Sequence, residues 1–195
     1  SGKSTLLNMM GGLDVPTSGQ VIVDGKELST LNDEALTIFR RRKIGFIFQS
    51  FFVQGNESVY DNVSLPLEIA RVPQSKRKTR VGQALKAVEL SDKVKSKAKN
   101  LSGGQKQRLA IARAIANEPS IIFADEPTGN LDSVTGAKVE ELLFGYNKNK
   151  GVTLIIVTHD AELAAKCDMI VNIKDGKIES VEQKKAQPTA RKVVQ

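Results

Sequence analysis

The sequence predicts an α/β fold with a mostly parallel sheet, and three observations support this prediction. Short, nearly continuous apolar runs recur along the chain, as expected for strands that are buried on both faces. Helical segments lie between these runs, so strands and helices alternate. At 195 residues, the chain is long enough for one domain with a single sizeable core. The runs are IGFIF, IIFA, TLIIVT and MIVNI.

Local signals place the elements of the N-terminal part. A helix begins at Lys3 and ends at the Gly11-Gly12 pair, because glycine favours a left-handed helix end. In GQVIVDGKEL, apolar and polar residues alternate around the Asp24-Gly25 pair, which predicts a hairpin. Asn32 is a good N-cap for a helix in DEALTIFRRR.

The pattern changes between residues 49 and 100, where helical spacing replaces the buried strands. Two or three amphipathic stretches are expected there, one with Val81, Leu85 and Val88 on a single face. We therefore predict an inserted helical subdomain that stands out from the sheet. A last hairpin is expected in IVNIKDGKIESV, with its turn at the Asp175-Gly176 pair. The predicted division is 1–48 and 101–181 for the core, 49–100 for the helical subdomain, and 182–195 for a basic, mobile tail.

Composition and charge exclude several classes of protein. No stretch approaches the ~18 consecutive apolar residues of a membrane span. Cys167 is the single cysteine, which excludes an internal disulfide, and we expect it to be a small buried apolar residue. The net charge of +7 owes much to residues 71–99, which hold ten Lys and Arg against Glu89 and Asp92. A solvated helical surface explains this stretch, and without stacking aromatics no nucleic-acid partner is expected. A weak attraction to anionic lipid headgroups stays open.

The chain opens with SGKST, which matches the second half of a phosphate-binding loop, G-x-x-x-x-G-K-[ST]. Gly2, Lys3, Ser4 and Thr5 supply the match, and four residues alone are a weak signal. The first glycine of the motif and its preceding strand are absent from this sequence. We therefore predict that the sequence is a fragment of a longer chain, without the first strands of its sheet.

A second informative stretch is IIFADEP, in which a buried strand ends at Asp125 and Glu126. Ligands of open α/β sheets bind at the carboxyl ends of the strands. In phosphate-loop enzymes, the aspartate at the strand end helps to hold Mg²⁺, while the serine of the loop ligates it. A second carboxylate can accept a proton from an attacking water. An acidic surface turn is the alternative interpretation.

The third stretch is LSGGQKQRLAIARAIANEP, where Ser102 and Gln105 fit a capping box. Gly103 and Gly104 weaken the first turn of this helix by ~1 kcal/mol each. Glycines do, however, let backbone amides approach an anion closely at the positive end of a helix. The helix is therefore predicted to receive phosphate, although the chain already has a phosphate loop. A second copy that faces the first would account for this duplication.

Together these motifs resemble those of the ATP-binding cassette (ABC) ATPases. The partial loop, LSGGQ, FADEP, a glutamine after IGFIF and a histidine after TLIIVT match over nearly the whole chain, in order. IGFIFQSFF, DNVSLPL and DEPTGNLDS look most like the bacterial group that powers lipoprotein export, macrolide export, antimicrobial-peptide resistance and the cell-division cassette. The resemblance implies a P-loop NTPase core with an inserted helical subdomain, and ATP and Mg²⁺ as cofactors.

The resemblance also implies roles for matched positions. Lys3 meets the β- and γ-phosphates, Gln49 senses Mg²⁺ and the attacking water, and His159 lies beside the γ-phosphate. Asn130, Leu131 and Asp132 fall in the D-loop, which contacts the opposite monomer. The implied catalytic residues are Glu126, His159 and Gln49; the metal-binding residues are Ser4, Gln49 and Asp125; the nucleotide-binding residues are Gly2, Lys3, Ser4, Thr5, Ser102, Gly103, Gly104, Gln105 and Asp132.

The mechanism implied by the resemblance is a head-to-tail dimer that traps two ATP molecules. Each nucleotide lies between the phosphate loop of one copy and the LSGGQ of the other, so both sites are equivalent by symmetry. The implied partners are a second copy of the chain and a membrane permease subunit, at the cytoplasmic face of the cell membrane. An alternative is a regulatory ATPase of the cell-division type, which acts on an envelope partner. Relatives that work in DNA repair or on ribosomes usually carry long coiled-coil insertions or a second cassette, and neither is visible here.

Overall fold

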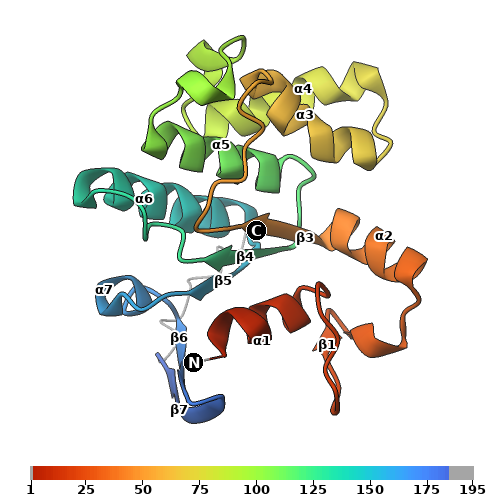
Figure 1. Ribbon diagram of the computed structural model, residues 1–195, viewed down its shortest axis with the longest axis vertical. Helices are drawn as coiled ribbons and strands as arrows, with labels where there is room; N and C mark the ends of the chain where they lie inside the picture. The colour runs from red at the N-terminus through yellow and green to blue at the C-terminus, as the bar shows by residue number, and fades with distance from the viewer. Residues whose placement is uncertain (1, 185–195) are drawn as a thin grey trace, which may run out of the picture.

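Three parallel strands form the centre of the molecule, with helices on both faces (Figure 1). The computed structural model describes residues 2–184. β3 (Ile44–Ile47), β4 (Ile121–Asp125) and β5 (Thr153–Val157) pair in the order β3-β4-β5, and Phe46, Phe123 and Ile155 lie in register. Parallel neighbours need crossover connections, and the helices supply them. The predicted α/β class and parallel sheet are confirmed for three of the four apolar runs.

The fourth run, MIVNI, is not part of this sheet, and the prediction was wrong there. It lies in β6 (Met169–Lys174), which pairs antiparallel with β7 (Lys177–Gln183). Met169 is 54% exposed, so this strand is not buried on both faces. An apolar run becomes a central strand only where layers cover both of its faces, and the hairpin lies beside the layers (Figure 1).

The turn of this hairpin is where it was predicted, at Asp175 and Gly176, whose φ angles are 49° and 76°. β7 continues to Gln183, so Glu182 and Gln183, expected to begin the tail, belong to the hairpin instead. The other residues of the expected tail, apart from Lys184, lie outside the described residues.

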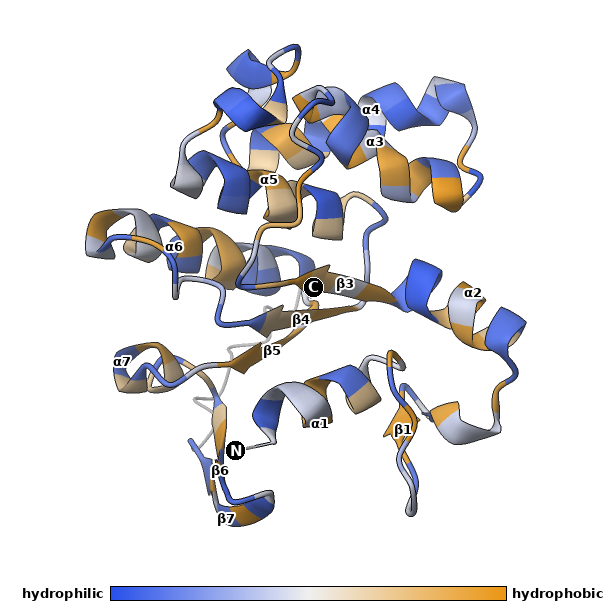
Figure 2. Ribbon diagram, in the orientation of Figure 1, coloured by the Kyte–Doolittle hydropathy of each residue, from blue (hydrophilic) through white to orange (hydrophobic). Residues whose placement is uncertain are grey.

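Successive residues of β4 face opposite layers, as the pleat of a strand requires. Ile121 and Phe123 pack with Leu7 in one cluster, on the side of α1 (Lys3–Met10) and α2 (Asp33–Lys43). Ile122 and Ala124 belong to a second cluster, which lies on the other side and is built mostly from four helices. Figure 2 shows hydrophobic residues along the strands between these layers. The helices of the second side are α3 (Val59–Ile69), α4 (Gln74–Ala87), α5 (Gly103–Ile115) and α6 (Ser133–Lys150).

Several local predictions are confirmed. The Asp24-Gly25 pair forms the turn between β1 (Ile22–Val23) and β2 (Lys26–Glu27), with both φ angles positive, as a tight hairpin turn requires. The Asn32 side chain accepts a hydrogen bond from the Ala35 amide at 2.9 Å and caps α2. α1 ends at Met10, and Gly12 is left-handed with φ 66°. The remaining helical elements are short: Leu28–Thr30, Ser91–Lys93, Ala98–Asn100 and α7 (Ala161–Ala164).

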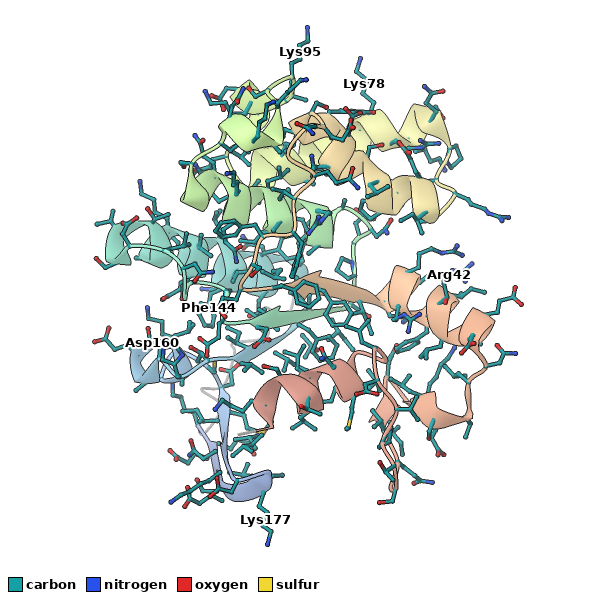
Figure 3. All side chains as sticks on the ribbon, in the orientation of Figure 1. Arg42, Lys78, Lys95, Phe144, Asp160 and Lys177 are labelled. Atoms are coloured by element: carbon teal, nitrogen blue, oxygen red, sulfur yellow. The ribbon has the colours of Figure 1, made fainter. Side chains whose placement is uncertain are left out.

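The helices between residues 49 and 115 form the layer farthest from α1 (Figure 1). Val81, Leu85 and Val88 are buried in it, as their helical spacing predicted. Lys78 and Lys95, from the basic stretch, lie on the side of this helical layer that faces away from the sheet (Figure 3). Cys167 is only partly buried, and burial raises the pKa of its thiol. Among residues 2–184, no helix has the length and hydropathy to cross a membrane.

Candidate nucleotide-binding site

The predicted catalytic and metal-binding residues gather at the carboxyl edge of the parallel sheet. Gln49 follows β3, Asp125 ends β4 with Glu126 next to it, and His159 follows β5. Because the three strands are parallel, their carboxyl ends meet at one edge, where open α/β sheets bind ligands. α1 also reaches this edge, since Ser4 Oγ donates a hydrogen bond to Asp125 Oδ1 at 3.3 Å.

The N-terminus of α1 has the features of an anion site. Gly2 is the N-cap residue, and its φ of 79° is a left-handed conformation that favours glycine. A Cβ on Gly2 would lie 3.5 Å from the Gly176 Cα, so the β6–β7 turn comes close. The amides of Lys3, Ser4 and Thr5 are in the first turn, where a helix has no carbonyl partners for them, and Gly2 offers no side-chain cap. This positive helix end is therefore available to phosphate oxygens.

Two side chains hold the Glu126 carboxylate. Its Oε2 accepts from Thr158 Oγ1 at 3.2 Å, and its Oε1 lies 2.8 Å from His159 Nδ1. The Glu126 side chain is only 17% exposed, whereas that of His159 is 79% exposed. The Glu126 backbone is left-handed, with φ 46°, and its amide donates to the Val157 carbonyl at 2.8 Å. The Glu126 backbone is thus held by the end of β5, and both carboxylate oxygens are held by the two residues that follow this strand.

Gln49 contacts the turn that follows Glu126. Its Nε2 donates to Asn130 Oδ1 at 3.4 Å, and Asn130 Nδ2 donates back to the Gln49 carbonyl at 3.0 Å. A Cβ on Gly129 would lie 3.1 Å from Gln49 Nε2 and 3.4 Å from Glu126 Cβ, so glycine permits this close packing. The structure therefore places the Gln49 side chain and the D-loop in direct contact.

The predicted phosphate-receiving helix, α5, begins with the expected capping box. Ser102 Oγ accepts from the Gln105 amide at 3.3 Å, and Gln105 Oε1 accepts from the Ser102 amide at 3.0 Å. The two glycines differ: a Cβ on Gly103 would meet nothing within 4 Å, but one on Gly104 would lie 2.2 Å from Thr135 Cγ2. Gly103 is thus open to a ligand, while Gly104 also has a packing reason to be glycine.

Asp132, predicted in the D-loop, caps α6. Its Oδ1 accepts from the Thr135 amide at 3.0 Å, and hydrogen bonds from the Thr135 side chain and backbone lower the pKa of Asp132. Thr135 thus lies between the first turn of α5 and the end of the D-loop. The structure does not bring the two predicted phosphate receptors together, because α1 and α5 lie on opposite sides of the sheet (Figure 1).

Thr158 and Gln107 contact the Glu126 turn and were not singled out by the sequence analysis. Thr158 directly precedes His159 at the strand end, so its position was a usable signal. Gln107 carries no such signal, because a glutamine two residues after LSGGQ reads as an ordinary helix residue.

Known proteins resemble this chain over most of its length. The family described as "ABC transporter" matches residues 1–129. An ABC transporter ATP-binding protein of Thermotoga maritima is 47% identical over 184 residues, which cover 94% of this chain and 78% of that protein. The lipoprotein-releasing system ATP-binding protein LolD 1 of Rhodopseudomonas palustris is 44% identical over 179 residues, which cover 91% of this chain and 79% of that protein. The macrolide export ATP-binding/permease protein MacB of Brucella abortus is 44% identical over 178 residues, 91% of this chain but 27% of that protein.

A solved structure is also similar. It is a dimeric post-hydrolysis state of the ATP-binding cassette MJ0796, from Methanocaldococcus jannaschii, bound to ADP and Pi. The TM-score is 0.85 at 43% identity, with 95% of this chain and 82% of that chain covered.

The fold and the edge of the sheet define a nucleotide-binding α/β protein of the phosphate-loop type. These matches show that the chain belongs to the ABC transporter family and that it is an ATPase domain of this family. The named relatives belong to export and release systems, and they do not favour the alternative of a cell-division regulator.

Proposed function

We propose that two copies of this chain, arranged head to tail, bind and hydrolyse ATP with Mg²⁺ and drive a membrane permease at the cytoplasmic face of the membrane. The observation that carries this proposal is the position of α1 and α5 on opposite sides of one sheet. Because the sheet separates them, one phosphate group cannot contact both N-termini of the same copy. A second copy related by two-fold symmetry can supply the missing N-terminus to each site. The dimeric, ADP- and Pi-bound structure of the similar MJ0796 cassette supports this arrangement.

The residues at the sheet edge suit Mg²⁺-ATP. Lys3 and the first amides of α1 would bind the β- and γ-phosphates, and the strand end would hold the metal. Ser4 Oγ and Asp125 Oδ1 lie 3.3 Å apart, and a hydroxyl and a carboxylate are oxygen ligands that Mg²⁺ prefers. Gln49 follows β3 at the same edge of the sheet. When bound, Mg²⁺ neutralises phosphate charge and polarises the γ-phosphoryl group.

Glu126 is the proposed general base. It would accept a proton from the water that attacks the γ-phosphorus, while the bond from phosphorus to the β-γ bridging oxygen breaks. Thr158 and His159 keep its two oxygens in a fixed orientation, which lowers the cost of positioning the water. Lys3 and the α1 amides would stabilise the charge that develops on the phosphate oxygens. Gly103 and Gly104 of the partner copy would present their amides to the same γ-phosphate.

The proposed contact with the permease lies beside Gln49, where the chain enters the helical layer. Phe52 is 67% exposed and has a left-handed φ of 44°. Ile69, at the end of α3, is also exposed. Both apolar side chains are accessible and could be covered by a protein partner. From the names of the LolD and MacB relatives, we propose that the permease is one of an exporter or lipoprotein-releasing type.

The Glu126→Gln variant tests the two-copy mechanism. It keeps the shape of the side chain but removes the base, so we expect ATP turnover to fall by about 100-fold or more. Mg²⁺-ATP should convert this variant from monomer to dimer, which light scattering after size-exclusion chromatography measures.

A matched pair of glycine variants provides the control. In the Glu126→Gln background, Gly103→Glu adds a carboxylate where nothing lies within 4 Å, so it should leave the fold intact but repel the phosphates and abolish the dimer. Gly82→Glu, in the equally open position on α4, should leave the dimer unchanged. A Glu126→Gln protein that stays monomeric at saturating ATP would contradict the proposal, as would full turnover by Gly103→Glu alone.

A further inference from the structure

We propose that Gln107 is a positioning residue, which holds the backbone turn that presents Glu126 and links this turn to α5. The inference rests on the proposed function, in that it takes Glu126 as the proton acceptor. It adds a contact from a different element of the fold, one that touches neither nucleotide nor metal.

The burial of Gln107 is the first observation. Its side chain is in the second turn of α5 and is 0% exposed. Nε2 donates a short hydrogen bond, 2.6 Å, to the Pro127 carbonyl, while Oε1 has no hydrogen-bond partner among the residues that the structure describes. A buried amide with an unpaired oxygen is less favourable than an apolar side chain of the same shape. Packing alone therefore does not explain a glutamine at this position, whereas the bond to Pro127 does.

The acceptor of this bond lies in the strained turn after β4. Pro127 follows Glu126, whose φ of 46° is left-handed, a conformation that a non-glycine residue keeps only where its surroundings hold it. Two backbone bonds hold Glu126 itself: its amide donates to the Val157 carbonyl, and its carbonyl accepts from the Gly129 amide at 3.1 Å. Gln107 provides a third restraint, on the next peptide, and this one comes from outside the turn and the neighbouring strand.

The same helix begins at the proposed phosphate receptor. Gln107 is separated from Gly103 and Gly104 by about one helical turn, and α5 runs uninterrupted to Ile115. A helix moves as a rigid element over such a distance, so a shift of its first turn against a phosphate displaces the Gln107 amide as well. Gln107 thereby conveys the contact made across the dimer to the turn that presents Glu126.

Gln107→Met tests this role, because methionine has a similar shape but cannot donate a hydrogen bond. We expect kcat for ATP to fall by about tenfold or more, since the base loses its orientation. KM should stay within about twofold, because Gln107 touches no nucleotide. The melting temperature should change by only a few degrees, because removal of the unpaired Oε1 offsets the loss of a donor to the buried Pro127 carbonyl. The same substitution at an exposed glutamine of α4, Gln83→Met, is the matched control and should leave kcat, KM and the melting temperature unchanged.

A second measurement does not depend on turnover. Amide hydrogen exchange at Gly129, whose N–H bonds to the Glu126 carbonyl, should become about tenfold faster in Gln107→Met, while the α5 amides keep their protection. In the Glu126→Gln background, Gln107→Met should cause no further loss of turnover, because both variants act on one group.

Two results would overturn the inference: a kcat of Gln107→Met within about twofold of the original protein, or unchanged exchange at Gly129. A protein that hydrolyses no ATP at all would instead refute the proposed function, and the exchange measurement would still decide whether Gln107 holds the turn.

Discussion

At the scale of single residues, the environment of Glu126 determines what its carboxylate can do. The resemblance to the family placed His159 beside the γ-phosphate, and the structure brings its Nδ1 to 2.8 Å from Glu126 Oε1. Thr158 holds the other oxygen and also accepts a hydrogen bond from the Asp160 amide, which begins α7. Two successive residues after β5 therefore each orient one oxygen of the proposed base. This arrangement makes the orientation of Glu126, and not only its presence, a condition for activity.

We predict that Thr158→Val lowers kcat by about tenfold, because a hydrogen bond to a charged group is lost while the shape of the side chain is kept. Thr158→Ser keeps the hydroxyl and should retain most of the activity. Steady-state ATPase assays of both variants check this prediction. Equal losses in the valine and serine variants would show that the methyl group, and not the hydrogen bond, matters.

At the scale of secondary-structure elements, the contact between α5 and α6 combines packing with the proposed binding. The first turn of α5 approaches Thr135 so closely that no Cβ fits on Gly104, and Thr135 also donates its amide to the cap at Asp132. The phosphate-receiving end of one helix and the D-loop end of the other are thus fixed to each other. A displacement of either helix end therefore moves the other.

Gly104→Ala should destabilise the protein by about 1–3 kcal/mol, because its Cβ would overlap Thr135 Cγ2. Thr135→Ser removes that methyl group but keeps the hydroxyl, so the double variant should recover most of the lost stability. Denaturant unfolding measures both effects.

Gly103→Ala is the matched variant for this test, because its Cβ meets nothing within 4 Å. It should be as stable as the original protein or about 1 kcal/mol more stable, since alanine favours a helix. A loss of stability at position 103 as large as that at 104 would contradict the packing argument.

At the scale of the whole molecule, the two apolar clusters share the central strand. Leu7 belongs to the cluster on the α1 side and Leu85 to the cluster of the helical layer. β4 contributes Ile121 to the first and Ile122 to the second, so neither layer can lose its packing without exposing the sheet. This shared strand is the reason to expect the layers to unfold together.

We predict that Leu7→Ala and Leu85→Ala each lower the free energy of unfolding by about 2–5 kcal/mol, because both side chains are buried. Circular dichroism and the fluorescence of dyes attached to either layer should report one transition at one midpoint. Separate midpoints for the two layers would show that the clusters are independent.

The sequence by itself determined the features that depend on neighbouring residues. The turn at Asp24 and Gly25, the cap at Asn32 and the capping box of Ser102 and Gln105 all join groups within a few residues, so their chemistry is readable from spacing. The alternation of apolar runs and helices likewise predicted the parallel sheet, and the motifs predicted the family. The predicted site residues at the ends of three strands, such as Asp125, followed from the same pattern.

Tertiary structure decided what depends on residues far apart in the chain. IGFIF and MIVNI look alike as sequences, but layers cover the first on both faces and leave Met169 of the second exposed. The packing reason for Gly104 comes from Thr135, and the reason for Gln107 comes from Pro127. Such contacts arise only after the elements have packed, because burial and hydrogen-bond partners are properties of the assembled layers and not of local spacing.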